Sequence, residues 1–159
     1  MEPLLHFSIP FVIISLTKVR LRYSMLAGII ALLPDLDVLF HAHRSISHSL
    51  IVSLALLAFL FVNRKFGLIA FFSWSSHILL DFIDGYVPLF WPFSEEAYGL
   101  IFEGQIEIYK SLEINLIFEI NKIPYNYGSF NNFEAPIFTF SGLIISIILL
   151  TITLLSKRG

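Results

Sequence analysis

Five long apolar segments leave this chain of 159 residues few ways to fold. Hydrophobic residues make up 57% of the sequence and charged residues only 14%, which is too little charge to cover a water-soluble domain of this size. The surplus apolar surface is therefore expected to contact a lipid bilayer. About 20 apolar residues in a helix cross the bilayer core, and somewhat fewer suffice where the bilayer thins. The sequence predicts an all-α, polytopic membrane helix bundle in one domain, residues 1–159, with spans at 3–17, 24–40, 46–62, 66–83 and 136–155.

The positions of the basic residues predict how this bundle is oriented. Five alternating spans bring the loops at 18–23 and 63–65 and the C-terminal tail to the same side of the membrane. Because Lys and Arg are enriched in cytoplasmic loops, that side is predicted to be cytoplasmic, with the N-terminus and the connection 84–135 extracytoplasmic. Seven of the ten Lys and Arg residues lie there: Lys18, Arg20, Arg22, Arg64, Lys65, Lys157 and Arg158.

The connection at 84–135 is expected to have mixed or irregular structure. It begins with aromatic and proline residues, which are typical of a segment at the level of the lipid headgroups. In its middle, residues 101–123 alternate apolar and acidic residues, and this pattern fits either a short β-hairpin or an amphipathic surface helix. Residues 125–132 are of turn-forming types.

The absence of cysteine restricts the chemistry that the chain can carry out. Disulfides, thiolate metal sites and cysteine nucleophiles are excluded. Any transition-metal site must use histidine and carboxylate, the ligands that suit zinc or manganese. The net charge of −2 gives no overall basic field, so no nucleic-acid partner is expected.

Ionisable residues inside apolar spans are costly and therefore indicate function. In the predicted orientation they all fall near the outer face of the membrane. His77 and Asp81, for example, lie about 17 and 23 Å along a helix that runs outward, at 1.5 Å per residue. The orientation rests on Lys and Arg alone, so this common depth independently predicts one site. Its members are His6, Asp35, Asp37, His48, His77 and Asp81.

The spacing of these residues indicates how they could share a metal. His77 and Asp81 are four residues apart, so they lie on one face of a helix, as two ligands of one metal require. Asp35 and Asp37 are two apart, and Pro34 before them predicts a local break in the helix. Such a break would let one carboxylate bind the metal and the other bridge or support it. Ser45 or Ser47 is expected to cap the third helix.

Four motifs follow one another along the chain: PDLD at 34–37, HRSISHS at 43–49, HILLD at 77–81 and WPFS at 91–94. In this order they resemble the YdjM-like family of membrane-bound, metal-dependent hydrolases. Together with an early histidine they extend from residue 6 to about residue 94. Ser45 stands where the family pattern has glycine, and Ser47 stands where it has threonine. The family is thought to be related to zinc-dependent phospholipase C and to single-strand nucleases.

The resemblance implies a metal centre of one to three divalent ions, zinc above all and manganese second. The ligands that it implies are His6, Asp35, Asp37, His43, His48, His77 and Asp81. The expected function is hydrolysis of a phosphoester in a lipid or lipid-linked substrate at the extracytoplasmic face. Asp37 would orient or deprotonate the attacking water, and Arg44 would hold a phosphate through two hydrogen bonds.

Two other functions fit the same ligands. A metal or proton transporter would use them as well, but it should carry polar residues on to the opposite face. The inner halves of the third and fifth spans, LALLAFLFV and IILLTITLL, are almost purely apolar, which disfavours such a path. A non-catalytic membrane protein with a structural metal is the third possibility.

Overall fold

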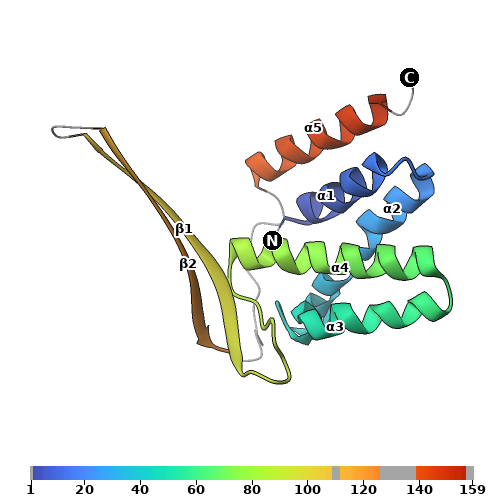
Figure 1. The fold of residues 1–159 in the computed structure, drawn as a ribbon, viewed down its shortest axis with the longest axis horizontal. Coiled ribbons are helices and arrows are strands. Elements are labelled where there is room, and N and C mark those ends of the chain that lie inside the picture. Colours follow the sequence, from blue (N-terminus) through green and yellow to red (C-terminus); the bar gives the residue numbers. More distant parts are fainter. Residues whose placement is uncertain (1, 109–111, 126–138, 157–159) are drawn as a thin grey trace.

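The computed structural model of the chain describes residues 2–108, 112–125 and 139–156. It consists of a body of helices and one antiparallel pair of strands that extends from the body as an arm (Figure 1). The α-helices are α1 (Pro3–Leu16), α2 (Leu21–Ile30), α3 (Leu50–Ala55), α4 (Arg64–Asp84) and α5 (Phe140–Ser156), the 3₁₀ helices are Pro34–Phe40, Ile46–His48 and Leu56–Phe61, and the strands are β1 (Glu96–Ile108) and β2 (Leu112–Pro124).

Helices occupy all five predicted spans. Among the described residues, however, two helices alone are long and apolar enough to cross a membrane. These are α2 with its 3₁₀ extension, Leu21–Phe40, and α4. At 1.5 Å per residue the 14 residues of α1 extend about 21 Å, whereas a bilayer core is about 30 Å thick. The shorter apolar helices are Pro3–Leu16, Leu50–Phe61 and Phe140–Ser156. The prediction of five spanning helices is therefore not supported; residues 136–138 of the fifth lie outside the described residues.

The helices pack through small and polar contacts around a modest apolar core. Ala27 and Ile30 of α2 meet Ile69 and Ala70 of α4 in one buried cluster. Ser15 of α1 donates a 2.8 Å hydrogen bond to Ser24 of α2, and Ser8 donates to Ser146 of α5 at 3.3 Å. Serine at helix contacts lets backbones approach closely in a lipid environment.

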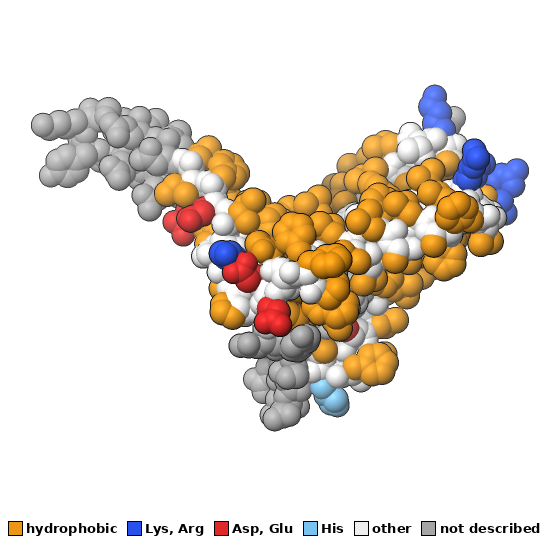
Figure 2. All heavy atoms as spheres, turned by 60° about the horizontal axis from the view of Figure 1, so that its bottom comes forward, with side chains coloured by type: hydrophobic (Ala, Val, Ile, Leu, Met, Phe, Trp, Pro, Cys, Tyr) orange, Lys and Arg blue, Asp and Glu red, His pale blue; other side chains and the backbone are white. Residues whose placement is uncertain are grey.

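The outside of the helical body is largely hydrophobic, and its basic residues gather at one end. Figure 2 shows hydrophobic side chains over the body and Lys and Arg side chains at the end remote from the arm. Large apolar side chains such as Leu16, Leu68 and Ile147 are more than half exposed. This is the distribution expected of a body surrounded by lipid. Lys157 and Arg158 lie outside the described residues.

The connection after α4 forms a β-hairpin, so the second of the two predicted structures, the surface helix, is wrong. The register pairs Leu100 with Ile120 and Phe102 with Phe118, and the rings of the latter pair lie 4.7 Å apart. Alternation along the strands places the ring pair on one face and puts Glu119 on the other. The hairpin also makes the fold mainly helical rather than purely α. Of the turn-forming stretch 125–132, residues 126–132 lie outside the described residues.

Candidate metal centre

Helix α4 brings His77 and Asp81 to one buried face. Their spacing places the two side chains one turn apart, and both are almost inaccessible to solvent. His77 Nε2 lies 3.3 Å from Asp81 Oδ2. The helix starts where the Asn63 side chain accepts a hydrogen bond from the Phe66 backbone N–H, so its register is fixed from the far end.

His48 reaches the same point from a short 3₁₀ turn. Its Nε2 lies 3.0 Å from Asp81 Oδ2 and 3.0 Å from His77 Nε2. Trp74 of α4 holds this turn, because its Nε1 donates a 2.7 Å hydrogen bond to the Ser47 carbonyl. A single proton can lie between two facing imidazole nitrogens, and a shared cation would satisfy both lone pairs equally well.

The cap of α3 differs from the prediction. The side chain that accepts from the first turn is Ser49, from Ile51 N at 3.1 Å, and neither Ser45 nor Ser47 does so. The reason is the 3₁₀ turn around His48, which delays the start of the α-helix. Ser49 also donates a 2.7 Å hydrogen bond to the carbonyl of Trp91, which ties the start of α3 to the segment after α4.

The helix break predicted at Pro34 is confirmed. The 3₁₀ helix that follows it places the two aspartates at opposite nitrogens of the His48 ring. A 3₁₀ helix begins at this proline, after α2 has ended. Its Asp35 directs Oδ1 toward the histidines, 3.8 Å from His48 Nε2 and 3.6 Å from His77 Nε2. Asp37 lies on the other side of His48, with Oδ2 3.4 Å from Nδ1.

The four converging groups match the dimensions of a tetrahedral metal site. One donor atom from each of Asp35, His48, His77 and Asp81 lies within 4.8 Å of all the others. Zinc bonds of about 2.0 Å in a tetrahedron put neighbouring ligand atoms about 3.3 Å apart. Both oxygens of Asp35 are buried without a hydrogen-bond partner, and Oδ2 of Asp81 faces the two histidines. A divalent cation would compensate these carboxylates, so the residues fit a metal.

Asp37 supports His48 from behind. Besides its contact with Nδ1, Oδ2 accepts hydrogen bonds from Ser45 N at 2.9 Å and from Ser47 Oγ at 3.2 Å. A carboxylate on one nitrogen of a metal-binding imidazole fixes the ring and turns the other nitrogen toward the metal. The geometry therefore gives Asp37 a positioning contact. Its predicted action on water stays a prediction.

The second oxygen of Asp81 joins His6 and Arg44 to the cluster. His6 Nε2 lies 3.6 Å from Oδ1, and Arg44 Nη2 lies 3.3 Å from the same atom. The His6 ring also packs on the His77 ring, with 4.1 Å between centroids. His6 and Arg44 thus lie beside the four-residue group and outside it.

Two residues near Arg44 have roles that the sequence patterns did not indicate. Asp84, which looks like an ordinary turn residue, accepts a 3.0 Å contact from Arg44 Nη2. At Gly85 a Cβ atom would collide with the Arg44 guanidinium. Arg44 itself has a φ of 53°, a left-handed backbone conformation that bulky residues rarely adopt.

His43 lies one step further out. Its ring meets the His48 ring edge-on, with centroids 6.1 Å apart. It lines a cavity of about 270 Å³ at the base of the arm, together with Arg44, Tyr86, Ala97, Ile123, Pro124 and Tyr125. Burial, and then the charge of Arg44, lower the pKa of His43. The imidazole is therefore neutral near pH 7, which is the form that binds metals.

The replacement of glycine by Ser45 causes no backbone strain. Its φ is −79°, which any residue can adopt. Ser47, in the place of threonine, keeps a hydroxyl that donates to Asp37. Both departures from the motif are thus accommodated, and both residues hydrogen-bond the same carboxylate.

Comparison with known proteins agrees with this assignment of motifs. A family model described as YdjM inner membrane protein matches residues 1–158. No curated protein and no solved structure matches the chain. The relationship to zinc-dependent phospholipase C stays a prediction. The match extends over nearly the whole sequence, and the chain belongs to the YdjM inner membrane protein family.

Proposed function

We propose that this protein is a membrane-embedded, metal-dependent hydrolase that cleaves a phosphoester of a lipid or lipid-linked substrate. The observation that carries the proposal is the convergence of Asp35, His48, His77 and Asp81, with Arg44 beside them. The topology proposed with it is multi-pass. The N-terminus and the site lie on the extracytoplasmic side, and the basic end and the C-terminus are cytoplasmic.

The four-residue group would hold the metal, with zinc favoured and manganese second. Two carboxylates and two neutral imidazoles balance the charge of one divalent ion. A bound metal of this kind lowers the pKa of its water and polarises the bond to be cleaved. The proposal of up to three ions takes His6 and His43, which lie beside the group, as further ligands.

Arg44 has the properties needed to hold the phosphate. Its side chain is 17% exposed, so a substrate can reach it, and it contacts Asp81 through a single nitrogen. The contacts of Arg44 with Asp81 and with Asp84 both use Nη2. A guanidinium that keeps donors free can bind two phosphate oxygens at once.

An apolar groove next to the cluster supports a lipid substrate. The cavity has a volume of about 220 Å³, lies between α1 and α4, and is lined by Ile9, Ile13, Phe72, Ser75, Ser76, Leu79 and Leu80. Ile9 follows His6 by three residues, and Leu80 follows His77 by three. From Leu80 to Phe72 the groove extends about 12 Å along α4 toward the basic end. It would hold an acyl chain while the headgroup lies at the metal.

The described residues favour the hydrolase over the transporter alternative. Among them, the buried polar side chains between the cluster and the basic end are hydroxyls, for example Ser15, Ser24, Ser53 and Ser73. Two of these, Ser15 and Ser24, bond each other. Ionisable side chains typically mark ion paths and proton relays in membrane proteins, and none of these buried residues is ionisable.

Metal content is the first test. Detergent-purified protein should carry at least one equivalent of zinc or manganese, measured by elemental analysis. Asp35→Ala and His77→Ala should each lose it, because each removes one of four ligands. His41→Asn serves as the control, since His41 is exposed and asparagine tolerates its φ of 56°. Metal-free wild type that cannot be reloaded, with folded variants, would refute the proposal.

Asp37→Asn should weaken metal binding without removing a ligand. Loss of a carboxylate behind a ligating histidine typically lowers metal affinity by about 10- to 100-fold. Zinc titration against a competing chelator measures this, and the number of ions bound at saturation should stay as in wild type. An unchanged affinity would show that the contact with His48 does not position the ring.

Arg44→Lys should lower phosphoester hydrolysis while leaving metal content intact. Lysine keeps the charge but cannot make the paired hydrogen bonds, so a loss on the order of 10²-fold in kcat is expected. The assay uses metal-loaded protein and a phospholipid substrate, with Arg64→Lys as the matched control. Equal rates in both variants would exclude a role of Arg44 in the reaction.

Ser76→Phe should fill the groove between α1 and α4. Hydrolysis of a long-chain phospholipid should then fall by about tenfold or more, since roughly 0.8 kcal/mol is lost per methylene excluded. Hydrolysis of a water-soluble aryl phosphate should not change. Leu68→Phe, on an exposed part of the same helix, is the control. A parallel loss with both substrates would indicate disturbed folding and not a chain-binding groove.

A further inference from the structure

A second pocket lies at the end of the helical body remote from the metal cluster. It has a volume of about 450 Å³ and is lined by Lys18, Val19, Arg20, Arg22, Tyr23 and Lys65. The first five residues come from the connection between α1 and α2 and from the start of α2. Lys65 comes from the first turn of α4. The pocket is therefore built by segments that are distant in the sequence.

Tyr23 organises the cations of this pocket. The Arg22 guanidinium lies 4.9 Å from the centre of the Tyr23 ring and donates a 3.2 Å hydrogen bond to its hydroxyl. The Lys65 ammonium lies 6.0 Å from the same ring centre. An aromatic ring between two cations offsets part of their repulsion, and it keeps both at the edge of the same hollow.

Four positive charges meet here, and the described residues supply no ion-paired carboxylate to balance them. Within the described part of the chain, no ion pair joins Lys18, Arg20, Arg22 or Lys65 to an acidic residue. Lys18 also has a φ of 59°, a conformation that costs free energy in a residue with a long side chain. An anion in the pocket would offset the repulsion between these cations.

We infer that this pocket binds the phosphate of an anionic phospholipid in the leaflet at the basic end of the protein. Two apolar residues point to a lipid in preference to a free phosphate. Leu16 and Leu21 flank the pocket in the sequence, and their side chains are 74% and 45% exposed, so acyl chains can pack against them. Basic pockets at this level of membrane proteins bind anionic headgroups.

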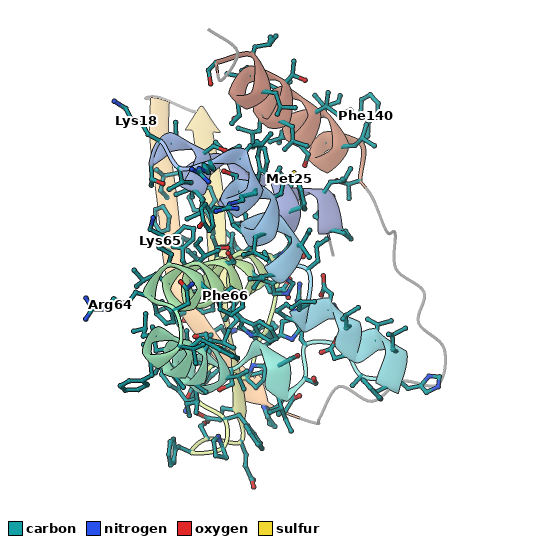
Figure 3. All side chains as sticks on the ribbon, turned by 90° about the vertical axis from the view of Figure 1, so that its right-hand side faces the viewer. Lys18, Met25, Arg64, Lys65, Phe66 and Phe140 are labelled. Carbon is teal, nitrogen blue, oxygen red and sulfur yellow. The ribbon has the colours of Figure 1, made fainter. Side chains whose placement is uncertain are left out.

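The arrangement differs from a simple excess of charge at a membrane surface. Arg64 is adjacent to Lys65 and carries the same charge, yet it does not line the pocket. In Figure 3 its side chain extends outward from the helical body, away from Lys65 and Lys18. A variant of Arg64 therefore distinguishes binding in the pocket from general attraction to a negatively charged membrane surface. The inference does not depend on the proposed hydrolase activity.

Native mass spectrometry of the full chain tests the inference. Detergent-purified protein is mixed with equal amounts of phosphatidylglycerol and phosphatidylcholine that have the same acyl chains. Wild type should retain phosphatidylglycerol about fivefold or more over phosphatidylcholine, the gain expected from one basic residue near a headgroup. Arg20→Gln combined with Lys65→Gln should bring the ratio close to one. Arg64→Gln should keep the wild-type ratio.

Three results would overturn it. Equal retention of both lipids by wild type would show no headgroup preference. An equal loss in Arg64→Gln would show that total charge matters and the pocket does not. Displacement of phosphatidylglycerol by millimolar inorganic phosphate would identify a free anion as the ligand. Arg20→Lys combined with Lys65→Arg changes the same two positions but keeps their charges, so it should keep the preference for phosphatidylglycerol. Loss of the preference in the glutamine variant alone would then reflect the lost charges and not a lost fold.

Discussion

The buried carboxylate of Asp81 determines how the helical body is assembled. An ionised group this deep among apolar helices is tolerated only with partners on every side. One of its oxygens meets His48 and His77, and the other meets His6 and Arg44. These partners come from α1, from the loop after α2, from the turn before α3 and from α4 itself. Apolar helix surfaces gain little from contacting each other in lipid, so these shared contacts with Asp81 are what fixes the helices relative to one another.

Polar contacts of this kind are the reason that so much of the site could be predicted from the sequence. In an apolar span an Asp or His stands out, and the distribution of Lys and Arg predicts the depth at which each one lies. The i, i+4 spacing of His77 and Asp81 and the proline before Asp35 then indicate a shared ligand set. All four members of the converging group were recognisable in this way, because groups that are so costly to bury need a partner in common.

The remaining features depend on geometry that residue types do not encode. The 3₁₀ turn that ends at His48 moved the helix cap to Ser49, and a sequence of three serines does not distinguish among them. The acidic and apolar alternation at 101–123 suits two structures, and cross-strand pairs such as Phe102 with Phe118 decided for the hairpin. Helix length was the weakest inference. Apolar runs continue into turns and 3₁₀ segments, so in the described residues three of the five predicted spans hold helices of 17 residues or fewer.

Gly85 has a consequence for how sequences of this kind can diverge. It has no functional group, and its extended backbone suits any residue, yet the space for a side chain is already occupied by the Arg44 guanidinium. A substitution at this position therefore competes with an arginine that is far away in the sequence. The guanidinium is the end of a flexible side chain and can shift, so the cost of a side chain at 85 is the disturbance of the contacts that Arg44 makes with Asp81 and Asp84. A side chain at 85 would therefore act on the cluster indirectly, through the position of Arg44.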